Sequence, residues 1–165
     1  MSKDRILSSP GTNAKSGSDP LPFQWLAREP ELCRNARFVD VDYKALMLAK
    51  REIIEAAPRM RDLLTPQALP DDGYTVLNAK EYIAVGCDLR DTNGLNIGME
   101  SSRPDQCLVF CVAEVSLVYM NPDTADALIE WAAHLSSGKS SKSSTRVRIP
   151  SGRGGRSTAF WINYL

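Results

Sequence analysis

Acidic residues lie at or near the ends of three apolar segments of this chain. Asp40 and Asp42 close the segment ARFVDVD, Asp88 follows EYIAVGC, and Glu114 lies within LVFCVAEVSL. Burying a carboxylate in such a segment is costly unless a partner compensates. A carboxylate can accept hydrogen bonds from both hydroxyls of a ribose, as the acid after the second strand of many nucleotide-binding sheets does. The repeated pattern therefore favours a ligand that contains adenosine.

A structural role for some of these acids is an open alternative. Asp42 directly precedes an expected helix and could cap it, and Asp91 or Thr92 could cap a short turn. For Asp42 alone, capping and ribose binding are equally good interpretations. Glu114 fits the alternative poorly, because it lies within an expected strand rather than at the start of a helix.

The segments that would position the acids alternate between strand and helix. Apolar and β-branched runs predict strands at 36–41, 81–89 and 108–117 and a short edge strand at 75–77. Helical spacing predicts helices at 23–29 and 43–57, and a third that Asn121 caps. The expected buried positions of the last two helices are Leu46, Ile53, Ile54 and Ala57, and Ala125, Leu128, Ile129 and Ala132. This alternation predicts an open, mostly parallel α/β sheet with its ligand beyond the carboxyl ends of the strands.

Composition divides the chain of 165 residues into three parts. Residues 1–19 are polar, residues 20–136 are the expected folded body, and residues 137–165 form a tail rich in Ser and Gly. The tail has six basic residues and no acidic ones, although the whole chain has 20 of each and a formal net charge of 0. The apolar end of the tail, AFWINYL, could dock as a short strand.

Several classes of protein are disfavoured by what the sequence lacks. Its four cysteines form no CxxC pair and it has a single histidine, His134, which argues against a zinc site and against Cys–His or Ser–His–Asp catalysis. The cysteines are expected to be reduced core residues. Neither GxGxxG nor a P-loop is present, which disfavours dinucleotide and kinase chemistry and leaves S-adenosylmethionine. No apolar run suits a membrane span or a signal peptide, so we expect a cytoplasmic protein.

Three blocks in sequence order resemble the leucine carboxyl methyltransferase family. They are FVDVDYKALMLAKREII, YIAVGCDLRDTNGL and VAEVSLVYMNPDTADALIEWAA, and the resemblance covers roughly residues 17–133. It implies a Rossmann-like methyltransferase sheet with flanking helices and S-adenosylmethionine as cofactor. One branch of the family methylates the C-terminal leucine of protein phosphatase 2A. The other acts on tRNA(Phe) in wybutosine biosynthesis, and this sequence is more similar to fungal members of that branch.

The resemblance also implies roles for individual residues. Asp42 would bind the ribose, Asp88 and Leu89 would lie along the adenine, and Glu114 would line the cofactor pocket. Gly17 matches the second glycine of a GxGxD-like motif that lets the backbone approach the methionine part of the cofactor. Lys15 stands where the first glycine belongs, and its side chain should crowd the cofactor.

The sequence departs from the family pattern at both ends. A polar segment replaces the first strand, and neither the basic N-terminal region nor the later strands of the sheet have a counterpart. We therefore expect an incomplete sheet and a shortened enzyme that binds the cofactor weakly and that the shortening could inactivate, and we expect Asp42→Ala to abolish this binding.

The expected function is S-adenosylmethionine-dependent carboxyl O-methylation of tRNA(Phe), with tRNA as partner and no metal or membrane. Two alternatives stay open. One is methylation of the protein phosphatase, and the other is a non-catalytic module that holds RNA through its basic tail.

Overall fold

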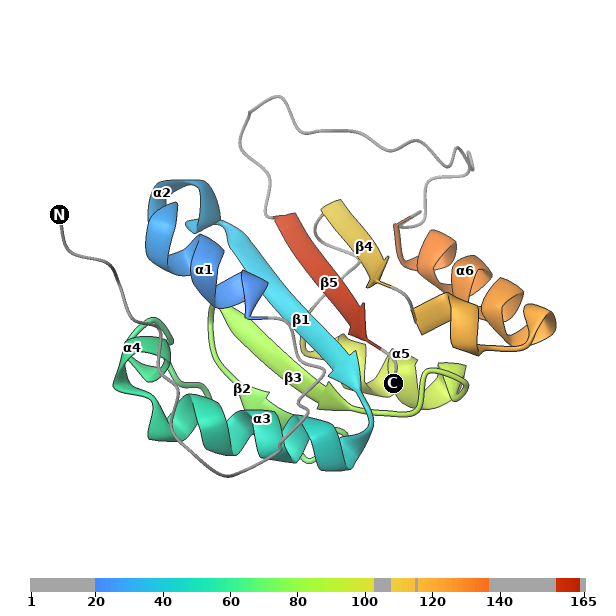
Figure 1. The fold of residues 1–165 in the computed structure, drawn as a ribbon, viewed down its shortest axis with the longest axis horizontal. Coiled ribbons are helices and arrows are strands. Elements are labelled where there is room, and N and C mark those ends of the chain that lie inside the picture. The colour runs from blue at the N-terminus through green and yellow to red at the C-terminus, as the bar shows by residue number, and fades with distance from the viewer. Residues whose placement is uncertain (1–19, 103–107, 115, 137–156, 164–165) are drawn as a thin grey trace, which may run out of the picture.

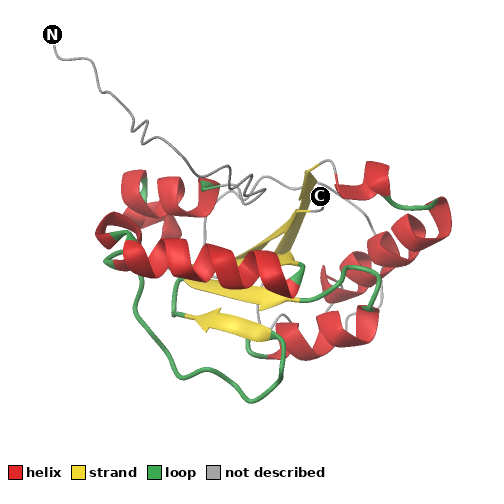
Figure 2. Ribbon diagram, turned by 60° about the horizontal axis from the view of Figure 1, so that its bottom comes forward, coloured by secondary structure: helices red, strands yellow, loops and turns green. Residues whose placement is uncertain are grey.

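The described residues form a five-stranded sheet with helices on both faces. The computed structural model describes residues 20–102, 108–114, 116–136 and 157–163 (Figures 1 and 2). The strands are β1 (Ala36–Asp42), β2 (Thr75–Asn78), β3 (Tyr82–Gly86), β4 (Leu108–Glu114) and β5 (Ser157–Asn163). The helices are α1 (Leu21–Arg28), α2 (Pro30–Cys33), α3 (Lys44–Ala56), α4 (Pro58–Arg61), α5 (Thr92–Glu100), the 3₁₀ turn η2 (Ser116–Tyr119) and α6 (Pro122–Ser136).

Four of the five strands run in parallel. The strand order is β2-β3-β1-β5-β4, and β1 pairs in parallel with both β3 and β5, while β4 pairs in parallel with β5. Only β2, at one edge of this sheet, is antiparallel to its neighbour β3. The expectation of an open, mostly parallel sheet with a short edge strand is confirmed, and the architecture is that of an incomplete Rossmann-like fold.

The strand β5 completes the middle of the sheet. It lies between β1 and β4, which do not pair with each other (Figure 1). In a doubly wound sheet of order 3-2-1-4-5, a strand with these neighbours holds the position of the first strand. The end of the tail therefore does dock as a strand, and it holds the position of the strand that the sequence analysis expected to be missing.

Side chains on the two faces of the sheet form separate apolar clusters. On one face, Phe38, Tyr82 and Ala84 pack with residues of α1 and α3. On the other, the intervening residues Val39, Val41, Ile83 and Val85 pack with residues of α5 and α6. This alternation places even-numbered residues of β1, including Asp40 and Asp42, on the face covered by α1 and α3.

The buried side chains of α3 and α6 differ in part from the expected ones. In α3 the buried residues are Met47, Lys50 and Ile54, whereas Ile53 is 46% exposed. The prediction is confirmed for Ile54 and was wrong for Ile53, because Lys50 is buried through an ion pair with Asp40 and changes which side of the helix faces the sheet. In α6, Leu128 and Trp131 are buried while Ile129 is exposed.

Two strands also end earlier than expected. The strand β3 ends at Gly86 rather than at residue 89, and β4 ends at Glu114, because residues 116–119 form a 3₁₀ turn. The predicted cap of α6 is confirmed, since the N–H of Thr124 donates to Oδ1 of Asn121 over 2.9 Å.

Candidate functional site

The carboxyl ends of the parallel strands bring two of the predicted positions, Asp42 and Glu114, to one edge of the sheet. Asp42 is level with Gly86 of β3, and Glu114 pairs with Asn163 of β5. Because Val41 pairs with Ile162, Asp42 and Asn163 follow at the same level. The strand β5 lies between β1 and β4, so two spacings of about 4.8 Å put the Cα atoms of Asp42 and Glu114 about 10 Å apart.

Asp42 is almost completely buried at the end of β1. Its side chain is 2% exposed, and its Oδ1 accepts a hydrogen bond of 2.7 Å from the N–H of Tyr43. Burial is the main cause that raises the pKa of this carboxyl to about 6, with a further contribution from the charge of Asp40; the Tyr43 N–H and Lys50 act in the opposite direction. The surroundings of Asp42 thus disfavour the ionised form of its carboxyl group.

Asp42 is not a conventional cap of α3. The N-cap residue is Tyr43, which makes no capping hydrogen bond through its side chain. A capping carboxylate would bind an N–H one turn further into the helix. Among the described residues, the bond from Tyr43 is the one hydrogen bond that the Asp42 carboxylate receives, so Oδ2 retains acceptor capacity that suits a ribose hydroxyl.

A close backbone contact fixes Asp42 relative to β3. A Cβ added at Gly86 would lie 2.7 Å from Cα of Lys44, so only glycine allows the start of α3 to approach the end of β3 this closely. In addition, the N–H of Cys87 donates to the carbonyl oxygen of Asp42 over 2.9 Å. The loop that carries Asp88 therefore leaves the sheet directly beside Asp42.

Asp88 is paired with a neighbouring arginine. Its Oδ1 accepts from Nε of Arg90 over 2.9 Å, and its Oδ2 accepts from Nη2 over 2.5 Å. The hydrogen bond from the Arg90 side chain is the main cause that holds the pKa of Asp88 below its usual value. The carboxylate is partly exposed, so it can accept a further donor at the same edge.

The side chain of Leu89 is buried, unlike that of Asp88. Its side chain is 1% exposed and belongs to the apolar cluster on the α5 and α6 face, together with Val85 and Leu95. The side chain therefore packs in the core, and any contact of Leu89 with a ligand at this edge falls to its backbone. Asp91 caps α5, since its Oδ1 accepts from the N–H of Gly94 over 2.9 Å, as the structural alternative proposed for it.

The structure gives less information on Glu114 and Gly17 than on the other predicted site residues. The backbone places Glu114 at the shared edge, through its pairing with Asn163. Gly17, like Lys15, lies outside the described residues, as do the rest of the segment 1–19 and residues 137–156 of the basic tail. The structure thus describes the edge expected to bind the ribose and adenine, and not the segment expected to bind the methionine part.

A buried ionic cluster lies behind Asp42. Lys50 of α3 forms an ion pair with Oδ2 of Asp40, and the hydroxyl of Tyr82 donates to the same oxygen over 2.6 Å. Sequence reasoning missed Lys50 and Tyr82. One signal was available: Lys50 is two helical turns from Asp42 on the helix that begins there, and it has the opposite charge to both acids of the strand.

The cysteines and other titratable groups give no competing chemistry in the described part of the chain. Cys33 and Cys87 are buried free thiols, and burial is the main cause that raises the pKa values of Cys87 and Cys111 to about 11. Within the same residues, no group of three or more metal-ligating side chains is placed to hold a metal ion. Nor do the described helices include one with the length and apolar character needed to cross a membrane.

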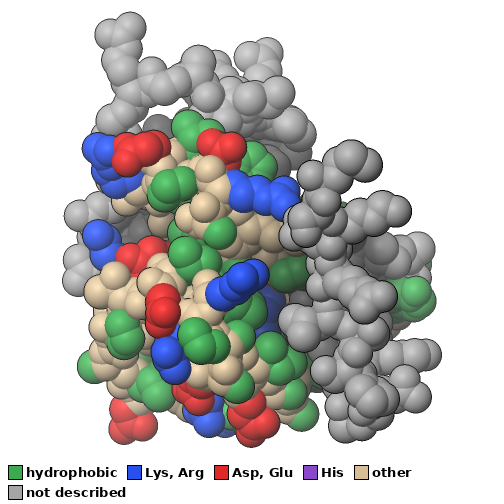
Figure 3. Space-filling view, turned by 60° about the vertical axis from the view of Figure 1, so that its left-hand side comes forward, with side chains coloured by type: hydrophobic (Ala, Val, Ile, Leu, Met, Phe, Trp, Pro, Cys, Tyr) green, Lys and Arg blue, Asp and Glu red, His purple; other side chains and the backbone are tan. Residues whose placement is uncertain are grey.

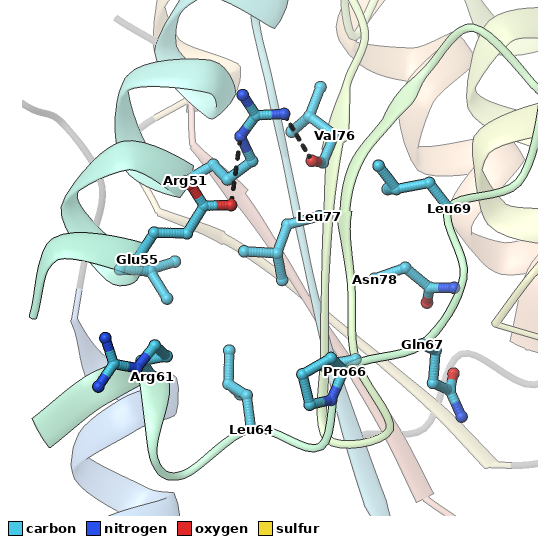
Figure 4. A pocket seen from close by; sticks show the side chains of 12 residues that line it. Arg51, Glu55, Arg61, Leu64, Pro66, Gln67, Leu69, Val76, Leu77 and Asn78 are labelled. Atoms are coloured by element: carbon cyan, nitrogen blue, oxygen red, sulfur yellow. Dashed lines mark hydrogen bonds and ion pairs between the residues drawn. The ribbon is translucent and has the colours of Figure 1, made fainter. Parts of the chain in front are cut away.

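A surface cavity of about 220 Å³ lies away from this edge (Figure 4). Residues of α3, of the segment after α4 and of β2 line it, and Arg51 at its rim pairs with Glu55 over 3.6 Å. None of the predicted site residues that the structure describes lines this cavity. On the face drawn in Figure 3, basic and acidic side chains of the described residues alternate rather than form a patch of one sign.

Comparisons with known proteins identify relatives of the chain. Residues 16–133 match the family model described as "Leucine carboxyl methyltransferase". The tRNA wybutosine-synthesizing protein 4 of Aspergillus oryzae is 39% identical over 126 residues, and that of Gibberella zeae is 40% identical over 127 residues. The protein of the same name from Saccharomyces cerevisiae is 32% identical over 129 residues. The alignments cover 72% to 75% of this chain and only 12% to 18% of the relatives.

Proposed function

Because the chain belongs to the leucine carboxyl methyltransferase family, we propose that it is an S-adenosylmethionine-dependent carboxyl methyltransferase, or the cofactor-binding part of one, that acts in wybutosine synthesis. The observation that carries this proposal is the position of Asp42, which is buried at the carboxyl end of β1 with acceptor capacity on Oδ2. The acceptor substrate is tRNA(Phe), by similarity to relatives named tRNA wybutosine-synthesizing protein 4, and the reaction takes place in the cytoplasm.

Each residue of the edge has a separate part in holding the cofactor. Asp42 accepts hydrogen bonds from the ribose hydroxyls, and Asp88 accepts one from the adenine amino group while Arg90 fixes its orientation. The backbone at Leu89 lies along the base, Glu114 lines the pocket, and Gly17 approaches the methionine part. This set fits an adenosine with two hydroxyls, because the carboxylates at the edge are acceptors and the ribose and amino group are donors.

The reaction requires the protein mainly to position the cofactor and the acceptor. The cofactor, when bound, supplies an electrophilic methyl group on a positively charged sulfur. A carboxylate acceptor is already ionised at neutral pH, so no side chain has to remove a proton from it. The protein's contribution is to hold cofactor and acceptor in line and to exclude water. A reaction that needs no catalytic base is consistent with a chain that has a single histidine.

The test is calorimetric titration with S-adenosylmethionine. We expect weak binding, since Lys15 replaces a glycine of the motif, and loss of this binding in Asp42→Asn. The matched control is Asp71→Asn, an exposed aspartate of the loop before β2, which should leave binding unchanged. Equal binding by wild type and Asp42→Asn would contradict the proposed role of Asp42.

Methyl transfer should then be measured with labelled cofactor and two acceptors. The first is tRNA that carries the unmethylated precursor, and the second is a peptide that ends in leucine. Transfer to the tRNA alone supports the proposal. Transfer to the peptide alone would instead place the chain in the phosphatase-modifying branch.

A further inference from the structure

Lys50 is a buried cation at the interface between α3 and the sheet. Its side chain is 4% exposed, its ammonium group pairs with Asp40, which is 1% exposed, and it lies 5.7 Å from the ring centre of Tyr82. Replacing such a buried ion pair with apolar residues is often neutral or stabilising. Stability alone therefore does not explain why this position holds a lysine.

The pair lies directly behind Asp42. Asp40 and Asp42 are two residues apart on one strand, so their side chains point to the same face at a spacing of about 7 Å. The helix α3 begins two residues after Asp42 and returns Lys50 to this face about two turns later. Among the described residues, Lys50 is the one buried cation, and it lies on the face that carries the two buried carboxylates.

We propose that Lys50 is a positioning residue for cofactor binding, whose charge keeps the carboxylate of Asp42 ionised and able to accept both ribose hydroxyls. The inference rests on the proposed function of Asp42. In this proposal the buried pair supports the binding edge. Asp40 fixes the position of the Lys50 ammonium group, and the positive charge of that group favours the ionised form of Asp42.

The surroundings of Asp42 restrict the groups that can do this. The groups that act on it are Asp40 of its own strand, the N–H of Tyr43 at the N-cap of α3, and Lys50 of α3. Lys44 is directed to the carbonyl oxygen of Gly73, and Arg90 after β3 is paired with Asp88. The charged residue of α1, Arg28, is exposed. Within the described part of the chain, the charges that act on the Asp42 carboxyl are those of Asp40, the larger effect, which raises its pKa, and Lys50, which lowers it.

The decisive comparison is between Asp40→Asn and the double variant Asp40→Asn with Lys50→Met. Both remove the carboxylate of Asp40, and they differ only in the charge of Lys50. Lys50→Met alone is less informative, because it leaves Asp40 buried without its cation, and either carboxylate could then bind the proton. Lys50→Arg is the conservative variant that keeps the charge.

The readout is the ¹³C resonance of the Asp42 carboxyl, followed as pH is varied without cofactor. We expect the midpoint in Asp40→Asn to lie about one pH unit below that of the double variant. Affinity for S-adenosylmethionine near pH 5 should follow the same order and differ several-fold, and Lys50→Arg should retain the wild-type midpoint. Equal midpoints in the two variants would overturn the inference, because a merely structural lysine would change stability and not this titration.

A measurement on the wild-type chain decides the matter if a variant does not fold. The ¹⁵N resonance of the Lys50 ammonium group should shift with the midpoint of Asp42, and independent midpoints would overturn the inference. A wild-type chain that binds no cofactor at any pH contradicts the proposed function, and with it this inference. A chain that binds cofactor with a pH profile insensitive to Lys50 contradicts the inference alone.

Discussion

The backbone N–H of Cys87 donates a hydrogen bond to the carbonyl oxygen of Asp42 over 2.9 Å, one residue beyond the end of β3. This bond extends the pairing of β1 and β3 to the point where Asp88 begins. The two acids expected to bind the ribose and the adenine are therefore spaced by backbone pairing, and their relation does not depend on the packing of their own side chains.

Asp42→Asn should stabilise the folded chain at neutral pH. The raised pKa, about 6 against an ordinary value of 3.8, means that ionised Asp42 opposes folding by up to about 3 kcal/mol. This penalty is absent below the unfolded value and grows as pH rises from about 4 to about 6. Urea denaturation should show a gain of about 1–3 kcal/mol at pH 7.5 that is nearly absent at pH 4. An equal gain at both pH values would contradict the assignment.

Gly86→Ala should destabilise the chain and weaken cofactor binding together. The added methyl group would lie 2.7 Å from Cα of Lys44, so the start of α3 has to move, and with it the N–H that orients Asp42. Overpacking of this kind costs about 1–3 kcal/mol. Chemical denaturation and cofactor titration measure the two effects.

The control for this substitution is Gly73→Ala. Gly73 has a φ of 74° and no atom within 4 Å of an added Cβ. It should cost about 1 kcal/mol through backbone conformation alone and leave cofactor affinity unchanged. A loss of affinity as large as that of Gly86→Ala would show that general destabilisation explains both.

Asn121→Ala should cost about 1 kcal/mol, because the N–H of Thr124 loses its acceptor. Asn121→Asp keeps the acceptor and should retain stability at neutral pH. Thermal unfolding of the three proteins measures the difference. If alanine and aspartate gave the same melting temperature, the cap would contribute nothing.

Phe160→Pro tests whether β5 joins β1 to β4. Phe160 pairs with Val39 on one side and with Cys111 on the other, and proline cannot donate a hydrogen bond in a central strand. Hydrogen exchange should accelerate in β1 and β4, with a smaller change at the β2–β3 pair. Phe160→Ala keeps the N–H and should have the milder effect. Unchanged protection of β4 in the proline variant would mean that β4 does not depend on β5.

Local patterns predicted most of the fold. Apolar runs located β1, β3 and β4, and a single asparagine located the start of α6. They could not give the orientation of α3, because Lys50 is buried through an ion pair with a residue ten positions away. Hydrophobicity assigns such a lysine to the surface, and only the partner across the interface makes its burial favourable.

The candidate site was predictable as a set of positions and not as a set of orientations. The rule that ligands bind beyond the carboxyl ends of parallel strands placed Asp42 and Glu114 at one edge. It did not separate Asp88, which is partly exposed, from the adjoining Leu89, which packs in the core. That difference depends on the conformation of the turn between β3 and α5, where both residues lie and where the alternation of strand side chains no longer applies.

The position of β5 has a consequence for how the chain acquires its structure. Of the described strands, β5 is synthesised last and lies in the centre of the sheet, so β1 and β4 emerge before the strand that pairs with both of them. Open edges of this kind are templates for pairing with other chains. Nascent chains should therefore be most prone to aggregate in the interval before β5 emerges, and synthesis arrested within residues 137–156 should yield more insoluble product than synthesis that continues past β5.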